Sequence, residues 1–240
     1  MLDAQARDRV IVALDCDRTQ ALAFADALAG HAHWIKIGMT LFYAEGPAIV
    51  REFKNRGFKV FLDLKFHDIP HQVRGAARSA ALAGADLLSV HGLGTGAMLS
   101  ACREGAEEAA GDNERAKLVA ITVLTSMSQD SLTEIGIQAP VQEEAERLAE
   151  LAVSNGIDGV VCSPREAARM RKIVGADGLV VTPGVRPAGA DLGDQTRVAT
   201  PAAAIEAGAS HIVVGRPITG AADPVAAFEA IVDELVSVEL

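Results

Sequence analysis

The sequence predicts an α/β fold, a (βα)8 TIM barrel in which parallel strands alternate with helices. Eight short apolar runs rich in β-branched residues are separated by alanine-rich stretches of helical character, the pattern of βαβ units. Glycine recurs where helices are expected to end, as in Asn55-Arg56-Gly57 and Ser154-Asn155-Gly156. The length of 240 residues suits one barrel. No linker or low-complexity segment interrupts the chain, so we expect a single domain over residues 1–240.

The first expected strand, residues 10–14, is followed by a helix over residues 19–29 with Thr19 as its N-cap. The other runs are equally short and apolar, as in parallel strands that are buried on both faces. They cover residues 34–38, 59–65, 86–90, 118–123, 159–162, 179–181 and 211–214. Eight strands are the number that closes a small barrel. An open doubly wound sheet is the alternative, but the turn after the first strand, Leu14-Asp15-Cys16-Asp17-Arg18, lacks the glycine-rich fingerprint typical of that fold.

Composition excludes several classes of protein. Hydrophobic residues make up 50% of the chain and aromatic residues 4%, so the core is expected to be large and aliphatic. The net charge of −10, with no cluster of Lys and Arg, argues against binding to nucleic acid. No apolar run reaches the roughly 20 residues of a membrane span, and the first residues do not resemble a signal peptide. Three scattered cysteines fit a reducing compartment. We therefore expect a soluble, cytoplasmic protein.

Two expected strand-to-helix connections are long, residues 126–140 after the fifth strand and residues 184–197 after the seventh. Loops of this kind lie at the catalytic face of a barrel and often act as lids.

Polar residues gather at the expected carboxyl ends of the strands, where barrel enzymes carry their chemistry. Asp63 and Lys65 lie two residues apart, so both are expected on one face of the third strand, with Lys36 at the matching level of the second. Charges inside parallel strands are costly unless they are paired. A structural ion pair that plugs the barrel is one interpretation. Several alternating charges favour an active site, because they hold an ammonium group where negative charge can develop. The other polar residues at strand ends are Asp15, Asp68, His91, Thr125, Ser126, Arg186 and Arg216.

The same region contains the residue types of a metal site, namely His67, His71, His91, Asp63 and Asp68. Lys36 and Lys65 argue against that interpretation, since two ammonium groups repel a divalent cation. We therefore predict no metal and expect His91 to pack or hydrogen-bond at the end of the fourth strand.

An anion site is expected at the last two strands. Gly215 and Arg216 follow the eighth strand, and Arg186 follows the seventh. Barrels frequently bind phosphate in these two loops, and two arginines suit a dianion. Gln195 in the long loop adds a neutral donor.

The segment Asp63-Leu64-Lys65-Phe66-His67-Asp68-Ile69-Pro70 resembles the signature of the orotidine 5′-phosphate decarboxylase family. The D-x-K-x-x-D core is shared by a wider barrel superfamily. The HDIP extension is more specific, as are Lys36, Gln195 and Arg216. The resemblance covers about residues 10–235, and the other matching segments are Leu14-Asp15, Lys36-Ile37-Gly38, Leu124-Thr125-Ser126, Pro183-Gly184-Val185-Arg186, Asp194-Gln195 and Val214-Gly215-Arg216-Pro217-Ile218-Thr219.

The resemblance implies decarboxylation of orotidine 5′-phosphate to UMP, the last step of de novo pyrimidine synthesis, without a metal or an organic cofactor. It implies that Lys65 donates the proton to C6, that Asp63 lies beside the substrate carboxylate, and that Asp68 enters the partner's site in a homodimer. The remaining implied contacts are Asp15 and Lys36 to the ribose, Thr125 and Ser126 to the pyrimidine, Arg186, Gln195, Gly215 and Arg216 to the phosphate, and Ile69, Gln72 and Pro183 elsewhere around the substrate.

The sequence departs from the family pattern after Pro70. The family usually continues with Asn-Thr, whereas this chain has His71-Gln72. The family's threonine is implied to approach the ribose of the neighbouring site, so we hypothesise that Gln72 changes the contact to the 2′-hydroxyl.

Three rival functions remain. A metal-dependent sugar-phosphate decarboxylase or aldolase of the same superfamily would carry an acidic ligand on the second strand, where this chain has Lys36. A sugar-phosphate isomerase would use a histidine-bound metal. A non-catalytic nucleotide-binding protein would tolerate the loss of Lys65.

Overall fold

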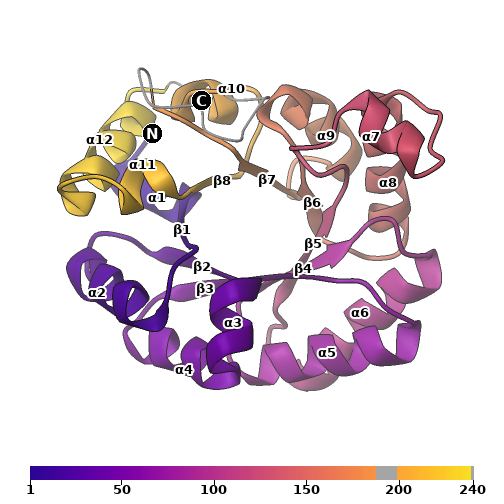
Figure 1. Ribbon diagram of the computed structural model, residues 1–240, viewed down its shortest axis with the longest axis horizontal. Helices are drawn as coiled ribbons and strands as arrows, with labels where there is room; N and C mark the ends of the chain where they lie inside the picture. Colours follow the sequence, from indigo (N-terminus) through magenta and orange to yellow (C-terminus); the bar gives the residue numbers. More distant parts are fainter. Residues whose placement is uncertain (188–198, 239–240) are drawn as a thin grey trace.

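The computed structural model describes residues 1–187 and 199–238, and over these residues eight parallel strands close into a barrel in sequence order (Figure 1). The first strand pairs with the last, Val10 opposite Ile212, which excludes the open sheet. The strands are β1 (Val10–Leu14), β2 (Trp34–Gly38), β3 (Lys59–Phe66), β4 (Leu87–His91), β5 (Lys117–Ile121), β6 (Gly159–Val161), β7 (Leu179–Pro183) and β8 (His211–Val214). The predicted (βα)8 barrel is confirmed.

Helices surround the strands on the outside of the barrel (Figure 1). Those that follow successive strands are α2 (Arg18–Leu28), α4 (Pro47–Asn55), α5 (Pro70–Leu82), α6 (Gly96–Ala110), α8 (Val141–Ser154), α9 (Ala167–Val174), α10 (Pro201–Glu206) and α12 (Pro224–Val236). Shorter elements are α1 (Asp3–Arg9), α3 (Met39–Glu45), α7 (Gln129–Glu134), η1 (Pro164–Glu166) and α11 (Arg216–Thr219).

Several predicted boundaries were wrong. The N-cap of α2 is Asp17 rather than Thr19, because the Asp17 carboxylate accepts the backbone N–H of Gln20 at 2.9 Å and the helix begins at Arg18. Strand β5 ends at Ile121, and β3 and β7 run past their predicted ends to Phe66 and Pro183.

The expected long connection over residues 126–140 contains the helix α7, with Ser128 as its N-cap. Most of the connection over residues 184–197 lies outside the described residues.

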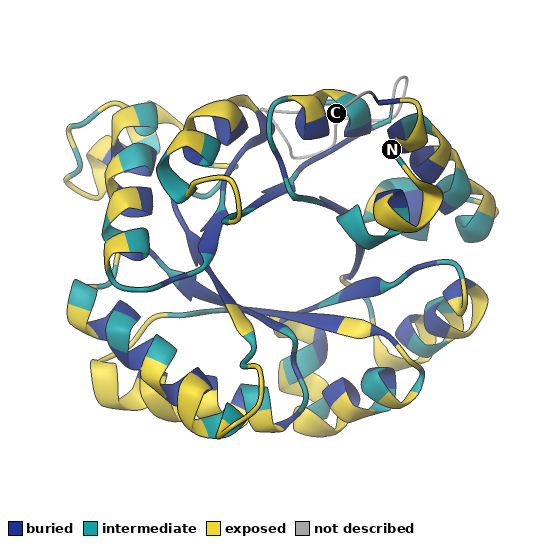
Figure 2. Cartoon of the chain, turned by 180° about the vertical axis from the view of Figure 1, so that it is seen from behind, coloured by how far each residue is buried: buried dark blue, intermediate teal, exposed yellow. Residues whose placement is uncertain are grey.

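The core has two parts. Inside the barrel, inward-facing side chains form a small cluster, and between the strands and the helices lies a larger aliphatic shell. Figure 2 shows the same division, with buried strands and with helices buried toward the barrel and exposed outward. The inner cluster consists of Ile11, Ala13, Trp34, Phe61, Leu87, Val119, Val181 and Val213. These side chains fill the interior, so a ligand has room only above them.

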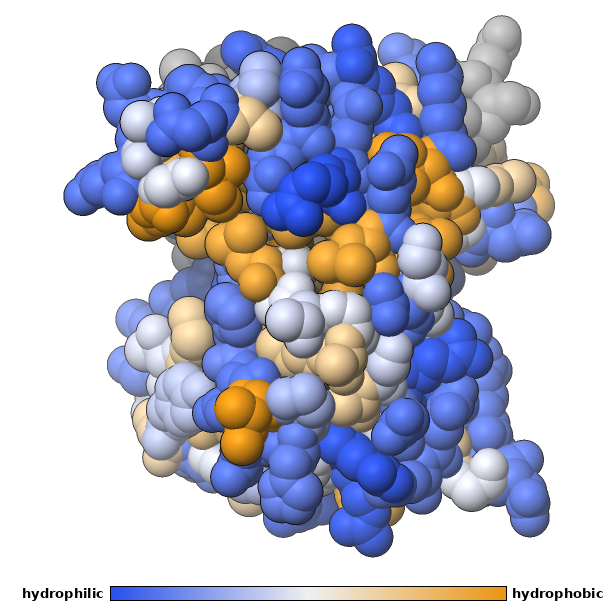
Figure 3. All heavy atoms as spheres, turned by 90° about the vertical axis from the view of Figure 1, so that its right-hand side faces the viewer, coloured by the Kyte–Doolittle hydropathy of each residue, from blue (hydrophilic) through white to orange (hydrophobic). Residues whose placement is uncertain are grey.

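The face in Figure 3 is mostly hydrophilic, with hydrophobic residues gathered in a band across its middle. Within the described part of the chain, no helix combines the length and the apolar character needed to cross a membrane.

Candidate active site

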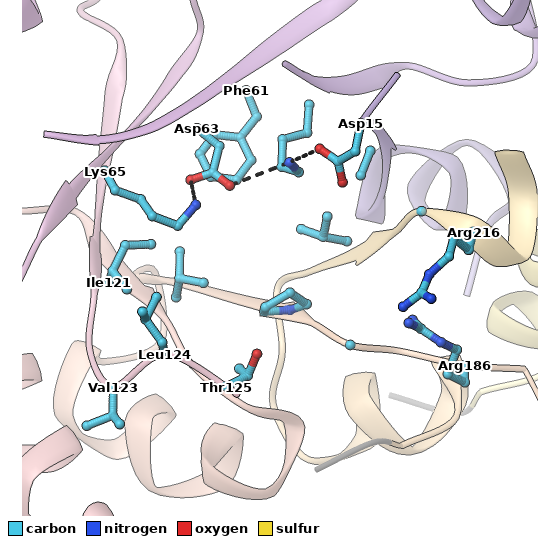
Figure 4. A pocket seen from close by; sticks show the side chains of 17 residues that line it. Asp15, Phe61, Asp63, Lys65, Ile121, Val123, Leu124, Thr125, Arg186 and Arg216 are labelled. Atoms are coloured by element: carbon cyan, nitrogen blue, oxygen red, sulfur yellow. Dashed lines mark hydrogen bonds and ion pairs between the residues drawn. The ribbon is translucent and has the colours of Figure 1, made fainter. Parts of the chain in front are cut away.

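A cavity of about 540 Å³ opens at the carboxyl ends of the strands (Figure 4). This volume is within the usual range for small-molecule sites. Apolar side chains of the barrel interior, including Phe61, Val161 and Val213, lie at its base. Charged side chains from β1 to β3 line one end and those from the loops after β7 and β8 line the other. The cavity is therefore suited to a ligand with two separate charged groups.

Alternating charges form a connected array at the first end of the cavity. The Lys36 ammonium donates to Asp15 Oδ1 at 3.0 Å and lies 3.6 Å from Asp63 Oδ2. The Lys65 ammonium donates to Asp63 Oδ1 at 2.9 Å. Figure 4 shows the Asp63 carboxylate beside the Lys65 ammonium, joined to it by a dashed line. The structure brings Lys36 together with Asp63 and Lys65, as the strand levels predict, and Asp15 extends the array. Asp68, the fourth member that the family resemblance implies, is exposed outside this cavity.

The route by which the chain brings Asp63 and Lys65 together differs from the prediction. Leu62 pairs with Leu88 and Phe66 with Val90, so β3 advances four residues while β4 advances two. This bulge contains both charged residues. Lys65 has a φ of 52°, and it is the one non-glycine residue with positive φ in the described chain. Such a conformation costs about 1–2 kcal/mol, and here it aims the lysine into the cavity.

Lys36 also reaches the array from a lower level than expected. In the β2–β3 register it is paired with Phe61, while Gly38 is paired with Asp63. The long lysine side chain extends along the barrel to the carboxylate.

Burial alone raises the pKa of the Asp63 carboxyl, whose side chain is only 11% exposed. The nearby ammonium groups of Lys36 and Lys65 outweigh burial, and hydrogen bonds from Lys65 and Ser89 add to their effect, so the pKa lies below its ordinary value. Asp63 is therefore ionised at neutral pH and keeps both lysines in place.

Two arginines line the other end of the cavity. Arg186 is buried, and its guanidinium donates to the carbonyl of Val185 at 2.9 Å. Arg216 follows Gly215 at the end of β8. The two guanidinium groups lie close to one another in Figure 4, on the opposite side of the cavity from Asp63 and Lys65. Two like charges in one corner of a cavity favour a dianionic group there.

The cavity contains nine of the predicted residues: Asp15, Lys36, Asp63, Lys65, Thr125, Pro183, Arg186, Gly215 and Arg216. Thr125 lies between the two charged ends in Figure 4, and Pro183 also lines the cavity. Asp68, Ile69 and Gln72 are exposed and do not line this cavity, and neither does Ser126. Gln195 lies outside the described residues.

His91 packs as expected at the end of β4. Its ring stacks on His67 with centroids 5.1 Å apart, and its Nδ1 accepts the Leu93 N–H at 3.2 Å. Burial, together with the charges of His67 and Lys65, lowers the pKa of His91 to about 4. His67 precedes α5, so it does not share a helical face with His71. No cluster of three or more metal-ligating side chains occurs among the residues described.

Comparison with known proteins agrees with this geometry. Residues 8–231 match the family model described as the orotidine 5′-phosphate decarboxylase / HUMPS family. The chain belongs to this family. It is 50% identical to the orotidine 5′-phosphate decarboxylase of Moorella thermoacetica, over 98% of this chain and 95% of the relative. It is 51% identical to that of Alkalilimnicola ehrlichii, over 96% and 97%.

A solved structure shows the same fold. The crystal structure of orotidine 5′-phosphate decarboxylase from Lactobacillus acidophilus superposes with a TM-score of 0.85. It is 40% identical and covers 95% of this chain and 99% of its own. The family resemblance found in the motifs is therefore confirmed over nearly the whole chain.

Sequence reasoning missed Ser89, which touches the array from β4. It is fully buried and its hydroxyl donates to Asp63 Oδ1 at 2.8 Å. The only signal in the sequence is a polar residue within the apolar run Leu87-Leu88-Ser89-Val90. The apolar residues at the base of the cavity were also missed, because they look like ordinary core positions.

Proposed function

We propose that this protein decarboxylates orotidine 5′-phosphate to UMP and CO2, the last step of de novo pyrimidine synthesis, in the cytoplasm and as one domain. One observation carries the proposal. A single cavity has an alternating array of lysines and aspartates at one end and two arginines at the other. The substrate likewise has a carboxylate at one end and a phosphate dianion at the other.

Loss of CO2 from C6 leaves an in-plane carbanion that the π system of the ring does not delocalise. A cation must therefore meet it. In this proposal the Lys65 ammonium stabilises the carbanion and protonates it. Asp63, 2.9 Å from Lys65, lies beside the departing carboxylate and keeps the ammonium charged and oriented.

The rest of the cavity binds the substrate. Asp15 and Lys36 hold the ribose, and Thr125 contacts the base. Ser126, which lies outside the cavity as described, and Pro183 are further substrate contacts assigned by family resemblance. Arg186, Arg216 and Gly215 bind the phosphate, with Gln195 as an additional donor. Phosphate binding far from C6 supplies energy that orders the reacting groups, as is general for enzymes that use remote binding energy. No step requires a metal or an organic cofactor.

We further propose that the active form is a homodimer in which Asp68 serves the partner's site. Asp68, Ile69 and Gln72 are assigned to a substrate site by family resemblance, yet all are exposed outside this chain's own cavity. Large apolar side chains are exposed in the segments that follow β2, β3 and β4. They are Met39, Tyr43, Ile69 and Leu93, which are 45%, 73%, 63% and 36% exposed. Exposed apolar residues of this kind commonly mark an interface.

The function is tested by following the absorbance of orotidine 5′-phosphate with purified protein in EDTA. Full activity in chelator is expected. Absence of turnover, or turnover that requires added metal, would contradict the proposal and favour the metal-dependent rival.

The shared site is tested by mixing two inactive variants, Lys65→Ala and Asp68→Asn. If Asp68 acts across the interface, a mixed dimer has one site with both groups intact, and activity returns to about a quarter of the wild-type value for random assortment. If Asp68 acts within its own chain, mixing restores nothing.

A further inference from the structure

The bulge in β3 leaves a backbone group without its regular partner in the sheet. Between Leu62 and Phe66 the β3–β4 register shifts, and Lys65 adopts its left-handed conformation there. A buried backbone N–H needs a substitute partner. The N–H of Lys65 finds one in the hydroxyl of Ser89, at 2.8 Å.

The same hydroxyl is used a second time. While its oxygen accepts from Lys65, it donates its hydrogen to Asp63 Oδ1 at 2.8 Å. Asp63 Oδ1 also accepts from the Lys65 ammonium, at 2.9 Å. The three residues thus form a closed loop in which Ser89 holds the backbone of the lysine and the carboxylate that the lysine faces.

Ser89 is placed to do this because it lies between Leu88 and Val90, the two residues of β4 that flank the bulge in the pairing. It is fully buried and does not line the cavity. Its hydroxyl therefore has no contact with a ligand there, and any effect on the reaction must pass through Asp63 and Lys65.

We propose that Ser89 is a positioning residue for decarboxylation: its hydroxyl stabilises the bulge and sets the relative placement of the Asp63 carboxylate and the Lys65 ammonium. This inference rests on the proposed function. Turnover of orotidine 5′-phosphate by the wild-type protein tests that function, and the ratio of variant to wild-type rates tests the inference separately.

The experiment compares kcat and KM for Ser89→Ala, Ser89→Thr and the wild type. Alanine removes both hydrogen bonds, so kcat should fall about 10- to 100-fold, the rate equivalent of one hydrogen bond to a charged group. KM should change less than about threefold, because the arginines at the other end of the cavity are untouched. Threonine keeps the hydroxyl and suits a strand, so it should recover most of kcat.

A pH profile separates positioning from a general loss of structure. Without the Ser89 donor the pKa of Asp63 rises, so the acid limb of kcat/KM should move to higher pH in Ser89→Ala and return in Ser89→Thr.

Ser210 provides a matched control at the opposite end of the barrel. Its hydroxyl also accepts a strand N–H, from Val180 at 2.9 Å, and donates to an oxygen, the Val180 carbonyl at 3.0 Å. Ser210→Ala should therefore lower the unfolding temperature without changing kcat.

The inference is overturned if Ser89→Ala keeps kcat within about threefold of wild type, or if Ser89→Thr is no more active than Ser89→Ala. It is also overturned if Ser210→Ala loses as much kcat. Should Ser89→Ala fail to fold, Ser89→Cys replaces it, because the thiol nearly fills the same space but is a weak hydrogen-bond partner. The inference is then overturned if Ser89→Cys keeps kcat within about threefold of wild type, or if Ser89→Thr is no more active than Ser89→Cys.

Discussion

Each end of strand β3 carries a lysine–aspartate ion pair, but the surroundings of the two pairs differ. At the carboxyl end, Lys65 lies 2.9 Å from Asp63, and at the amino end Lys59 lies 2.8 Å from Asp8. The side chains are 28% and 11% exposed in the first pair, against 48% and 42% in the second. Distance alone does not distinguish them. The two pairs are distinguished by the deeper burial of the Lys65–Asp63 pair and by the cavity beside it.

At the amino end the charges cover an aromatic ring. Asp8 accepts from the Trp34 indole at 3.2 Å, and the Lys59 ammonium lies 5.3 Å from the centre of the Trp34 ring. Trp34 belongs to the inner cluster, so this group closes the barrel. Exposed pairs of this type contribute about 0–1 kcal/mol. The comparison shows that this barrel covers its core with an ion pair at one end and places a more buried ion pair beside a cavity at the other.

The largest expected difference comes from removing each lysine. Lys65→Ala should lower kcat at least about 1000-fold, because it removes the group that we propose as both the proton donor and the cation that meets the carbanion. Lys59→Ala should leave kcat unchanged. Steady-state assays of both variants measure the contrast, and substantial activity in Lys65→Ala would support a non-catalytic role for the cavity.

Next in size is the effect of the phosphate-binding end. Arg216→Ala should lower kcat/KM about 100-fold, mainly through KM, because it removes the charge-assisted contact that we propose Arg216 makes to the phosphate dianion. Arg9→Ala, at the amino end of the barrel, is the matched control and should leave both constants as they are. Equal effects of the two variants would contradict the assignment of Arg216 to the substrate.

Residues at the amino end of the barrel should instead affect how the free energy of unfolding depends on pH. Burial lowers the pKa of His211 to about 4, with the charge of Asp8 opposing and those of Arg9 and Lys59 adding to the shift. An unfolded histidine has a pKa near 6.5. The unfolded state therefore binds more protons between these values, and stability falls by up to about 3 kcal/mol as pH drops from about 6.5 through 4.

His211→Asn should flatten this dependence while keeping a donor for Ser210, which the His211 ring contacts at 3.0 Å through Nδ1. Urea unfolding at a series of pH values measures the slope. His91, whose pKa is also lowered to about 4, contributes a remaining slope. An unchanged slope in His211→Asn would show that His211 does not titrate in this range.

The smallest expected effect concerns the edge of the active site. Gln72→Thr should change KM by about two- to fivefold, because it replaces an amide with the hydroxyl that the family resemblance places near the ribose. Gln72 is exposed at the start of α5. Identical kinetics for the variant and the wild type would rule out a ribose contact by Gln72.

Much of the site was predictable because charge is rare in buried strands. Asp63, Lys65 and Lys36 stand out in apolar runs, and the loops after the last two strands of a barrel commonly bind phosphate. Strand ends were less predictable, since an apolar run such as residues 118–123 does not reveal where pairing stops. The N-cap of α2 was wrong because Asp17 and Thr19 are both favourable capping residues and only the backbone geometry selects between them.

By itself the sequence determined the alternation of strands and helices and the charged residues and arginines at strand ends, because strand patterning and the cost of unpaired buried charge are local properties. Closure of the barrel came from the pairing of β1 with β8, which excluded the open sheet. Only the tertiary structure decided how the array is held. The bulge in β3, the left-handed Lys65, the reach of Lys36 from the level of Phe61 and the role of Ser89 all depend on the register between neighbouring strands. Register is a relation between segments distant in sequence, and in this barrel it places Lys36, Asp63 and Lys65 together beside the cavity.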